Sequence, residues 1–357
     1  MQQKLNIYKM NFASKSLLII ILVTLMRCQQ PETTTVVTPD PVEINDFIGH
    51  WSLDIEGDMA VGWLGVTNDG FLDASLLWRG GSVVPVANVY IQGDRLIATR
   101  LSNRVRARDE NGEATRSHQV TNTLEVFKKG DNEVYGYYLV PTNDGLGVDT
   151  TTFVGIKLPE ITQKPDLSSL KFSEPVSLFN GKDLTGWRLL NENQKNGFSV
   201  ENGVLVNNPV QPENGEHIRY GNIRTDQEFE DFNLTLEVNI PKGNNSGVYL
   251  RGIYEIQVLD SYGQPLDSHN MGALYSRITP STAAEKPADT WQTLDITLID
   301  RHITVILNGT KIIDNQPAYG PTGGAISHDV FAKGPIYLQG DHGKVSYRNI
   351  VLKPIIK

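Results

Sequence analysis

Short runs of β-branched and aromatic residues, separated by turn-forming residues, recur along almost the whole chain. The Asn-Gly, Asp-Gly and Gly-Gly pairs between them are typical of tight turns that join antiparallel strands. The runs are 51–57, 60–67, 72–78, 83–93, 95–101, 121–130, 133–141 and 151–159 in the first half, and 198–208, 232–240, 246–260, 291–300, 302–314, 334–341 and 344–355 in the second. Beyond the N-terminal segment, no stretch has the apolar period of a long helix. The sequence therefore predicts an all-β protein.

The length of the chain favours two β domains, since 357 residues exceed the roughly 100–200 of a single domain. A polar, proline-bounded segment at 160–175 is interpreted as a linker between domains at 44–159 and 176–357. The regular strand spacing in the first domain predicts a small antiparallel barrel or sandwich. Gly49-His50-Trp51 at its start is similar to the opening Gly-x-Trp of lipocalin-like barrels. Trp51 is then expected to pack on the barrel floor.

The N-terminal segment has the layout of an export signal. Lys4, Lys9 and Lys15 precede an apolar stretch, Leu17 to Met26, that is too short to span a bilayer. Cys28 follows where a bacterial lipoprotein signal places its lipidated cysteine, although Arg27 departs from the small residue usual before it. Residues 1–28 are thus predicted to be a signal peptide and 29–43 a Thr- and Pro-rich tether. We expect an exported, membrane-anchored lipoprotein; the alternative is an uncleaved anchor with an incidental cysteine.

The charge balance and the missing motifs exclude several functions. A net charge of −9 and a pI near 5.3 argue against nucleic acid as a partner, which would need clustered Lys and Arg. A neutral substrate fits this balance better. The sequence has no serine-hydrolase elbow, P-loop or dinucleotide fingerprint, and no histidine cluster with the spacing of a zinc site.

The run Ser246 to Asp260 carries the most informative pattern of polar residues. Taken as one strand, it places Tyr249, Arg251, Glu255 and Gln257 on one face and mostly apolar residues on the other. The simplest interpretation is a wet outer face. Yet these side chains form a donor, acceptor and stacking set that suits hydroxyl-rich ligands, so we expect a ligand-facing strand.

His342 is the histidine best placed for chemistry. It lies between Gly340 and Gly343 at a strand-to-turn junction, where a side chain can be aimed into a cleft. Gln339, Asp341 and Arg348 are nearby partners that could orient it or tune its pKa. A purely structural histidine is the competing interpretation.

Several motifs of the second half resemble the 3-keto-disaccharide hydrolase family. These are SLFNGKDLTGWR, NNSGVYLRGIYEIQVLDS, WQTLDITLIDRHITVILNG and GPIYLQGDHGKVSYRNIVLKPI, which together cover roughly residues 174 to 357. The resemblance implies a concanavalin-like jelly-roll sandwich, bacterial export, and action on glycosides whose C3 hydroxyl has been oxidised to a ketone. The first domain lies outside the resemblance.

Such chemistry needs a general base, an acid for the leaving oxygen, and donors or a metal for the enolate. We expect Glu255 and His342 to be the base and acid, in either order, with Arg251 and Gln257 holding the ketone or hydroxyls. The resemblance supports these positions as site residues and does not fix their individual roles. Further predicted substrate contacts are Tyr249, Asp260, Tyr275, Arg277 and Gln339. A divalent metal could stabilise the enolate, but no ligand spacing points to one, so no cofactor is predicted.

Two alternatives remain open. Glu255, Gln257 and Asp260 partly match the acidic strand of laminarinase-type retaining glycosidases, but Gln257 replaces an acid and Asp260 has the wrong strand parity. A non-catalytic carbohydrate-binding lipoprotein would have the same fold without the reaction.

Overall fold

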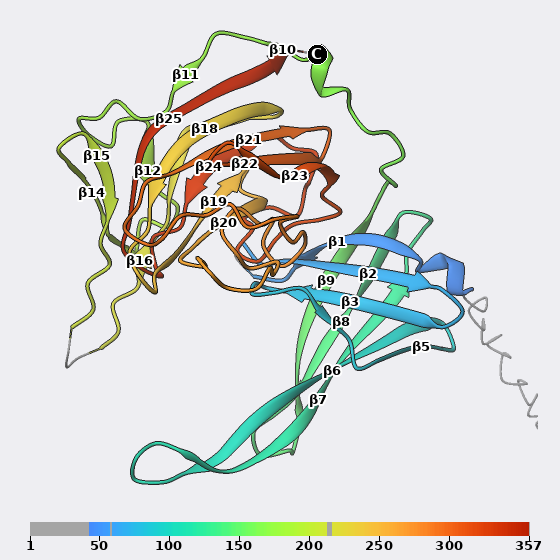
Figure 1. The fold of residues 1–357 in the computed structure, drawn as a ribbon. Coiled ribbons are helices and arrows are strands. Elements are labelled where there is room, and N and C mark those ends of the chain that lie inside the picture. Colours follow the sequence, from blue (N-terminus) through green and yellow to red (C-terminus); the bar gives the residue numbers. More distant parts are fainter. Residues whose placement is uncertain (1–42, 58, 213–215, 357) are drawn as a thin grey trace, which may run out of the picture. The chain divides into compact units, whose positions relative to one another are not determined.

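The computed structural model describes residues 43–57, 59–212 and 216–356. This part of the chain is almost entirely β, with two short 3-10 helices, η1 (Ile44–Asp46) and η2 (Leu167–Ser169) (Figure 1). The all-β prediction is confirmed. The predicted signal peptide, Cys28 and all but the last residue of the predicted tether lie outside the described residues. Within the described ranges no helix is both long and apolar enough to cross a membrane.

The first half forms one nine-stranded antiparallel sheet with the order β4-β3-β2-β1-β9-β8-β7-β6-β5. Its strands are β1 (Gly49–Ile55), β2 (Val61–Asn68), β3 (Leu72–Trp78), β4 (Val84–Pro85), β5 (Asn88–Gln92), β6 (Arg95–Arg108), β7 (Ala114–Lys128), β8 (Glu133–Pro141) and β9 (Val148–Leu158).

The two edge strands of this sheet, β4 and β5, follow each other in the chain, and the residues between them close the sheet into a barrel. Between them, the Val86 amide donates to the Ala74 carbonyl of β3 (3.0 Å) and the Ala87 amide to the Thr99 carbonyl of β6 (2.6 Å). Trp51 is buried in the barrel's apolar core. The predicted small antiparallel barrel is therefore confirmed.

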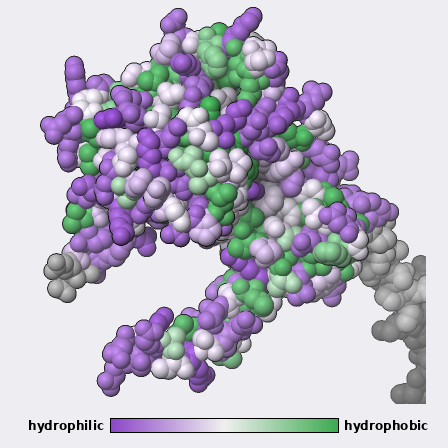
Figure 2. Space-filling model, in the orientation of Figure 1, coloured by the Kyte–Doolittle hydropathy of each residue, from purple (hydrophilic) through white to green (hydrophobic). Residues whose placement is uncertain are grey.

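The hairpin of β6 and β7 is longer than the predicted runs. Arg104, Arg106 and Arg108 lie on β6 and Arg116 on β7, around the turn of this hairpin. In Figure 2 the tip of the hairpin is hydrophilic, like most of the face shown. A solvated charged hairpin is thus the appropriate description of these arginines.

The second half forms two principal sheets and a small parallel pair, β13 with β16. One sheet has the order β14-β15-β25-β18-β21-β22-β23, with β10 and β11 also paired to β25; the other has the order β12-β17-β24-β19-β20. The strands are β10 (Lys171–Phe172), β11 (Val176–Ser177), β12 (Trp187–Leu189), β13 (Lys195–Asn196), β14 (Phe198–Glu201), β15 (Val204–Asn207), β16 (Tyr220–Gly221), β17 (Ile223–Phe229), β18 (Phe232–Asn239), β19 (Asn245–Leu250), β20 (Tyr254–Leu259), β21 (Gln292–Ile299), β22 (His302–Leu307), β23 (Thr310–Pro317), β24 (Gly334–Leu338) and β25 (Val345–Ile356).

These two sheets pack face to face. Alternate residues of β18 are buried, and Leu236 from this strand shares one apolar core with Ile256 from β20 of the other sheet. β20 is buried on both faces over most of its length. The predicted β-sandwich is confirmed, and the second face of its smaller sheet is covered as well.

The run 246–260 is a hairpin rather than the single strand expected. Arg251 and Gly252 have φ angles of 56° and 67°, in the left-handed region that reverses the chain between β19 and β20. Tyr249 nevertheless pairs directly with Glu255, and Gly247 with Gln257. Because residues of equal parity face each other across this turn, the predicted face is retained for Tyr249, Glu255 and Gln257.

The barrel and the sandwich lie within one compact unit, Asp40–Lys357. Trp63, Leu77 and Leu158 of the barrel belong to the same apolar cluster as the sandwich core. The domain boundaries set from the sequence stay a prediction.

Candidate active site

A pocket of about 250 Å³ lies against the smaller sheet of the sandwich. Side chains from three adjacent strands line it: Tyr249 of β19, Glu255 of β20 and Tyr337 of β24. The segment after β24 adds Gln339, Asp341 and His342, and the loop after β20 adds Tyr275. Five residues predicted from the sequence therefore come together here: Tyr249, Glu255, Tyr275, Gln339 and His342.

Glu255 is 3% exposed, and a glycine makes room for its carboxyl group. A Cβ added at Gly247 would lie 2.3 Å from Oε1 of Glu255, so no larger residue fits there without moving the carboxyl. Desolvation raises the pKa of Glu255 to about 8, against the opposing effects of the Tyr249 hydroxyl and the His342 charge. At neutral pH this side chain is mostly an uncharged acid that can donate a proton.

Tyr249 and Tyr337 form a stacked pair beside Glu255. Their ring centroids are 3.8 Å apart, with the planes inclined by 13°. The Tyr249 hydroxyl donates to the Gly323 carbonyl (2.8 Å) and the Tyr337 hydroxyl to the Gly324 carbonyl. Burial raises the pKa of both phenols, so they stay neutral. The pair is a rigid, apolar wall with fixed hydroxyl positions.

His342 and Asp341 form a hydrogen-bonded dyad at the pocket. Nδ1 of His342 lies 2.7 Å from Oδ1 of Asp341. Because a carboxylate only accepts, Nδ1 carries the proton, and Nε2 is the basic nitrogen of the neutral ring. The hydrogen bond with Asp341 raises the pKa of His342, with burial acting against it. The dyad has the arrangement of an oriented general base.

The turn that carries the dyad is held by three asparagines. Buried Asn207 donates through Nδ2 to the carbonyls of Gly340 (3.0 Å) and Gly343 (2.9 Å). The Oδ1 of Asn222 accepts from the Gly340 amide, and the Oδ1 of Asn244 from the Lys344 amide. These bonds fix the backbone on both sides of His342.

Two further pocket residues offer vacant acceptors. Oδ1 of Asn245 and Oε1 of Gln339 are buried without a hydrogen-bond partner among the described residues. Buried amide oxygens are costly to leave unpaired, so a hydroxyl-rich ligand would improve their bonding.

The other predicted contacts do not line this pocket. Arg251 lies in the hairpin turn, 4% exposed, and its guanidinium donates to the carbonyls of Val330 and Ala332. Arg277 donates to the Pro321 carbonyl, and its guanidinium lies 4.4 Å from the ring centroid of Trp63. Both arginines stabilise the chain fold around the site.

Gln257 and Asp260 are also displaced from the pocket. Gln257 shares the face of Glu255 but is 2% exposed, and its Oε1 has no partner in the described part of the chain. The Oδ2 of Asp260 accepts from the Gly243 amide (2.9 Å), which ties it to the end of the hairpin.

Some lining residues escaped the sequence prediction. Tyr337 has the strand parity of Gln339 and could have been found from the pattern GPIYLQG. Asn222 and Asn245 carry no such signal. Arg79, Gly80 and Gly81 come from the barrel, in the loop after β3.

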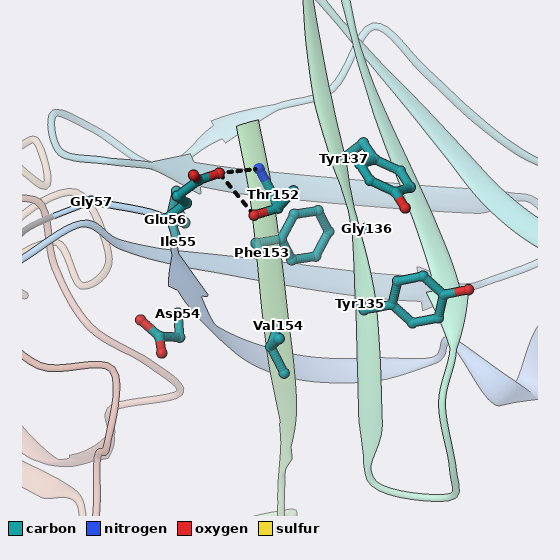
Figure 3. A pocket seen from close by; sticks show the side chains of 10 residues that line it. All are labelled: Asp54, Ile55, Glu56, Gly57, Tyr135, Gly136, Tyr137, Thr152, Phe153 and Val154. Carbon is teal, nitrogen blue, oxygen red and sulfur yellow. Dashed lines mark hydrogen bonds between the residues drawn. The ribbon is translucent and has the colours of Figure 1, made fainter. Parts of the chain in front are cut away.

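A wider hollow of about 520 Å³ lies on the barrel (Figure 3). Tyr135 and Tyr137 of β8 line it together with Glu56 and Thr152, and the Glu56 carboxylate accepts from the Thr152 hydroxyl (2.9 Å). Asp54, another lining residue, has its Oδ1 3.6 Å from Nδ1 of His328, but the Asp54 side chain is more than half exposed. The buried acid and the histidine that faces it come together in the smaller pocket.

No group of three or more His, Cys, Asp or Glu side chains that could hold a metal ion is found in the described ranges. The lining groups of the smaller pocket whose pKa values are shifted are Glu255, His342 and the two stacked tyrosines.

Comparisons with known proteins concern mainly the second half. A family model described as "3-keto-alpha-glucoside-1,2-lyase-like domain" matches residues 174–353. No curated protein matches the chain. A solved structure of a candidate glycosyl hydrolase from Parabacteroides distasonis is 29% identical, covering 55% of this chain and 92% of that chain, with a TM-score of 0.42. Another from the same organism is 25% identical, covering 51% and 100%, with a TM-score of 0.38.

Proposed function

The chain belongs to the 3-keto-alpha-glucoside-1,2-lyase-like domain family through residues 174–353, and on that premise we propose that it cleaves 3-keto-glycosides, 3-keto-disaccharides among them. A carbohydrate-active role follows from the family itself. The proposal adds the keto-sugar substrate and an elimination–hydration reaction.

One observation carries the proposal: a buried, neutral carboxylic acid and an oriented histidine share a small polar pocket. Glu255 has a pKa of about 8, and Asp341 holds the Nδ1 of His342. The two are close enough for their charges to affect each other's pKa. Groups with such opposed tasks and shifted pKa values are typical of acid–base sites.

The reaction follows from the acidity that a C3 ketone gives to the hydrogen on C2. Nε2 of His342 removes this proton, and the electrons form an enolate on the C3 oxygen. As the enolate collapses, the bond from C1 to the leaving oxygen breaks and Glu255 donates a proton to that oxygen. Water then adds to C1 of the resulting enone, and C2 regains a proton. The sum is hydrolysis, without an oxocarbenium ion.

The remaining pocket groups suit this substrate. The Oδ1 of Asn222 accepts from the Gly340 amide, which leaves its Nδ2 to donate to the enolate oxygen. The vacant acceptors of Asn245 and Gln339 suit sugar hydroxyls, and the Tyr249–Tyr337 pair offers an apolar surface.

Turnover of a 3-keto-disaccharide by the full chain tests the proposal. We expect Glu255→Gln and His342→Ala each to lower kcat by at least about 100-fold, as for loss of a general acid or base. Glu201→Gln and His217→Ala, at exposed positions away from the pocket, are matched controls and should keep full activity.

Isotope labelling tests the route. In D2O, elimination–hydration leaves deuterium on C2 of the released keto-sugar, whereas direct hydrolysis leaves hydrogen there. Unlabelled product would contradict the route. Saccharide binding with no turnover by the wild type would instead favour a carbohydrate-binding module.

We also propose that the protein is exported and lipid-anchored through Cys28, on the strength of the N-terminal sequence pattern. Metabolic labelling with a radioactive fatty acid should mark the wild type and not Cys28→Ser. Equal labelling of both proteins, or of neither, would refute the anchor.

A further inference from the structure

The pocket of the sandwich has one wall that comes from the barrel. Arg79, Gly80 and Gly81 line it, from the segment Arg79–Val83 between β3 and β4, which we call the 79–83 loop. We propose that the barrel is part of the substrate site: the 79–83 loop closes one side of the pocket and restricts it to short saccharides. This inference rests on the proposed function and assigns a role to the domain outside the family match.

A chain of hydrogen bonds holds the loop beside the pocket. Ser82 Oγ lies 2.8 Å from Nε2 of His269, and Nδ1 of His269 lies 2.5 Å from Oδ1 of Asp267. Because the Asp267 carboxylate only accepts, Nδ1 carries the ring proton, and Nε2 of the neutral ring accepts from the Ser82 hydroxyl. The Tyr275 hydroxyl, at the pocket, is 3.3 Å from the same Ser82 oxygen. One residue on, the Val83 amide donates to the Ser276 hydroxyl (2.9 Å).

The loop also touches the backbone that positions the tyrosine pair. A Cβ added at Gly323 would lie 2.0 Å from the carbonyl oxygen of Gly81, so the two backbones are in direct contact. Gly323 and Gly324 provide the carbonyls that accept from Tyr249 and Tyr337. The loop therefore packs directly behind groups that shape the acid's surroundings.

The packing of Trp63 against the sandwich holds the barrel in place. Trp63 is 6% exposed, and its Nε1 donates to the Tyr319 carbonyl (2.8 Å). A Cβ added at Gly320 would lie 2.2 Å from the Trp63 ring, which shows how closely the indole is seated. Together with the Arg277 guanidinium over its face, this contact gives the loop a rigid base.

The size of the pocket limits the substrate class. Its volume of about 250 Å³ is below the roughly 300–1,000 Å³ typical of sites for drug-sized ligands. That space suits one or two sugar rings. On the side that the 79–83 loop closes, a longer oligosaccharide would meet this loop, so the inference predicts selection for mono- and disaccharide glycosides.

The test uses the full chain with single substitutions in the barrel. Arg79→Ala shortens a side chain of the pocket wall, and Ser82→Ala removes the bond to His269. Ser117→Ala, at an exposed position of β7, is the matched control. Binding of a 3-keto-disaccharide and a 3-keto-tetrasaccharide is measured by calorimetry, and KM and kcat by turnover.

We expect Arg79→Ala and Ser82→Ala to weaken disaccharide binding about 2- to 12-fold, the range for one lost hydrogen bond. KM should rise with kcat nearly unchanged, and the affinity for the tetrasaccharide relative to the disaccharide should increase. Ser82→Thr, which keeps a hydroxyl, should restore the wild-type values. Ser117→Ala should match the wild type throughout.

Arg79→Ala and Ser82→Ala with the affinity and length preference of Ser117→Ala would overturn the inference. If the wild type binds saccharides without turning them over, the proposed reaction fails, while the affinities still test the wall. No binding of either saccharide by the wild type would refute both.

Discussion

The position and the protonated state of the Glu255 carboxyl depend on its neighbours. The missing side chain of Gly247 leaves the space that the carboxyl occupies, and burial removes the water that would stabilise its ionised form. A carboxyl group on an ordinary strand face would be ionised at neutral pH and could not serve as the proton donor. The acid function is therefore a property of the surrounding side chains as much as of the glutamate.

Gly247→Ala tests this dependence. Its backbone is not in the left-handed region, so alanine is conformationally allowed, but its Cβ would collide with Oε1 of Glu255. We expect a fold that remains intact and a kcat lowered by about 10- to 100-fold, as for a misplaced catalytic group. Circular dichroism and steady-state kinetics measure the two effects. Undiminished kcat would mean that the carboxyl position does not matter.

The pH dependence of kcat/KM follows from the two shifted groups. His342 must be neutral to act as the base, and its pKa is raised above the ordinary range, so activity rises as the pH passes this raised pKa. Glu255 must be protonated to act as the acid, so activity falls as pH passes about 8. The expected profile is a narrow bell.

Asp341→Asn separates the two limbs of that bell. It removes the carboxylate that raises the pKa of His342, so the acidic limb should move to lower pH. The alkaline limb should be affected much less. An acidic limb that stays in place would exclude His342 as its source.

At the scale of elements, the β19–β20 hairpin shows what a strand pattern can and cannot predict. The alternation of side chains placed Tyr249, Glu255 and Gln257 on one face, and the observed register keeps them there. The turn at Arg251 was missed because Arg-Gly can adopt left-handed angles inside an apparently continuous β run. Its guanidinium therefore left the predicted ligand face and bonded to carbonyls instead.

Arg251→Ala should accordingly affect stability before chemistry. It leaves the buried carbonyl of Val330 and the partly buried carbonyl of Ala332 without their charged donor. We expect the free energy of unfolding to fall by about 2–4 kcal/mol, as for buried hydrogen bonds to a charged group. Urea denaturation measures it.

The matched control is Arg188→Ala. Arg188 forms an ion pair with Asp226 in which both side chains are more than half exposed, so its loss should cost no more than about 1 kcal/mol. Equal losses of unfolding free energy in the two variants would show that the hydrogen bonds of Arg251 contribute no more to stability than an exposed ion pair.

At the scale of the whole molecule, the limit of sequence reasoning is long-range contact. Strand spacing and family motifs predicted the all-β class, the barrel, the sandwich and part of the pocket. The 79–83 loop gave no signal, because Ser82 meets His269 only after the chain has folded both domains. Arg277 was predicted to line the cleft, whereas its guanidinium contacts Trp63. This contact joins the two halves of the chain, so it too could not be seen in the sequence.

This contact makes the barrel and the pocket energetically interdependent, and Trp63→Ala tests the coupling. Removing a buried indole should lower the free energy of unfolding by about 3–5 kcal/mol. It should also weaken disaccharide binding under conditions in which the protein remains folded, because the loop loses its rigid base.

Trp51→Ala, in the barrel's own core, should be destabilising to a similar degree. Since Trp51 has no bond to the sandwich among the described contacts, binding by its folded form should be close to that of the wild type. Equal effects of both substitutions on disaccharide affinity would mean that general loosening of the barrel, and not the contact of Trp63 with the sandwich, determines binding in the pocket.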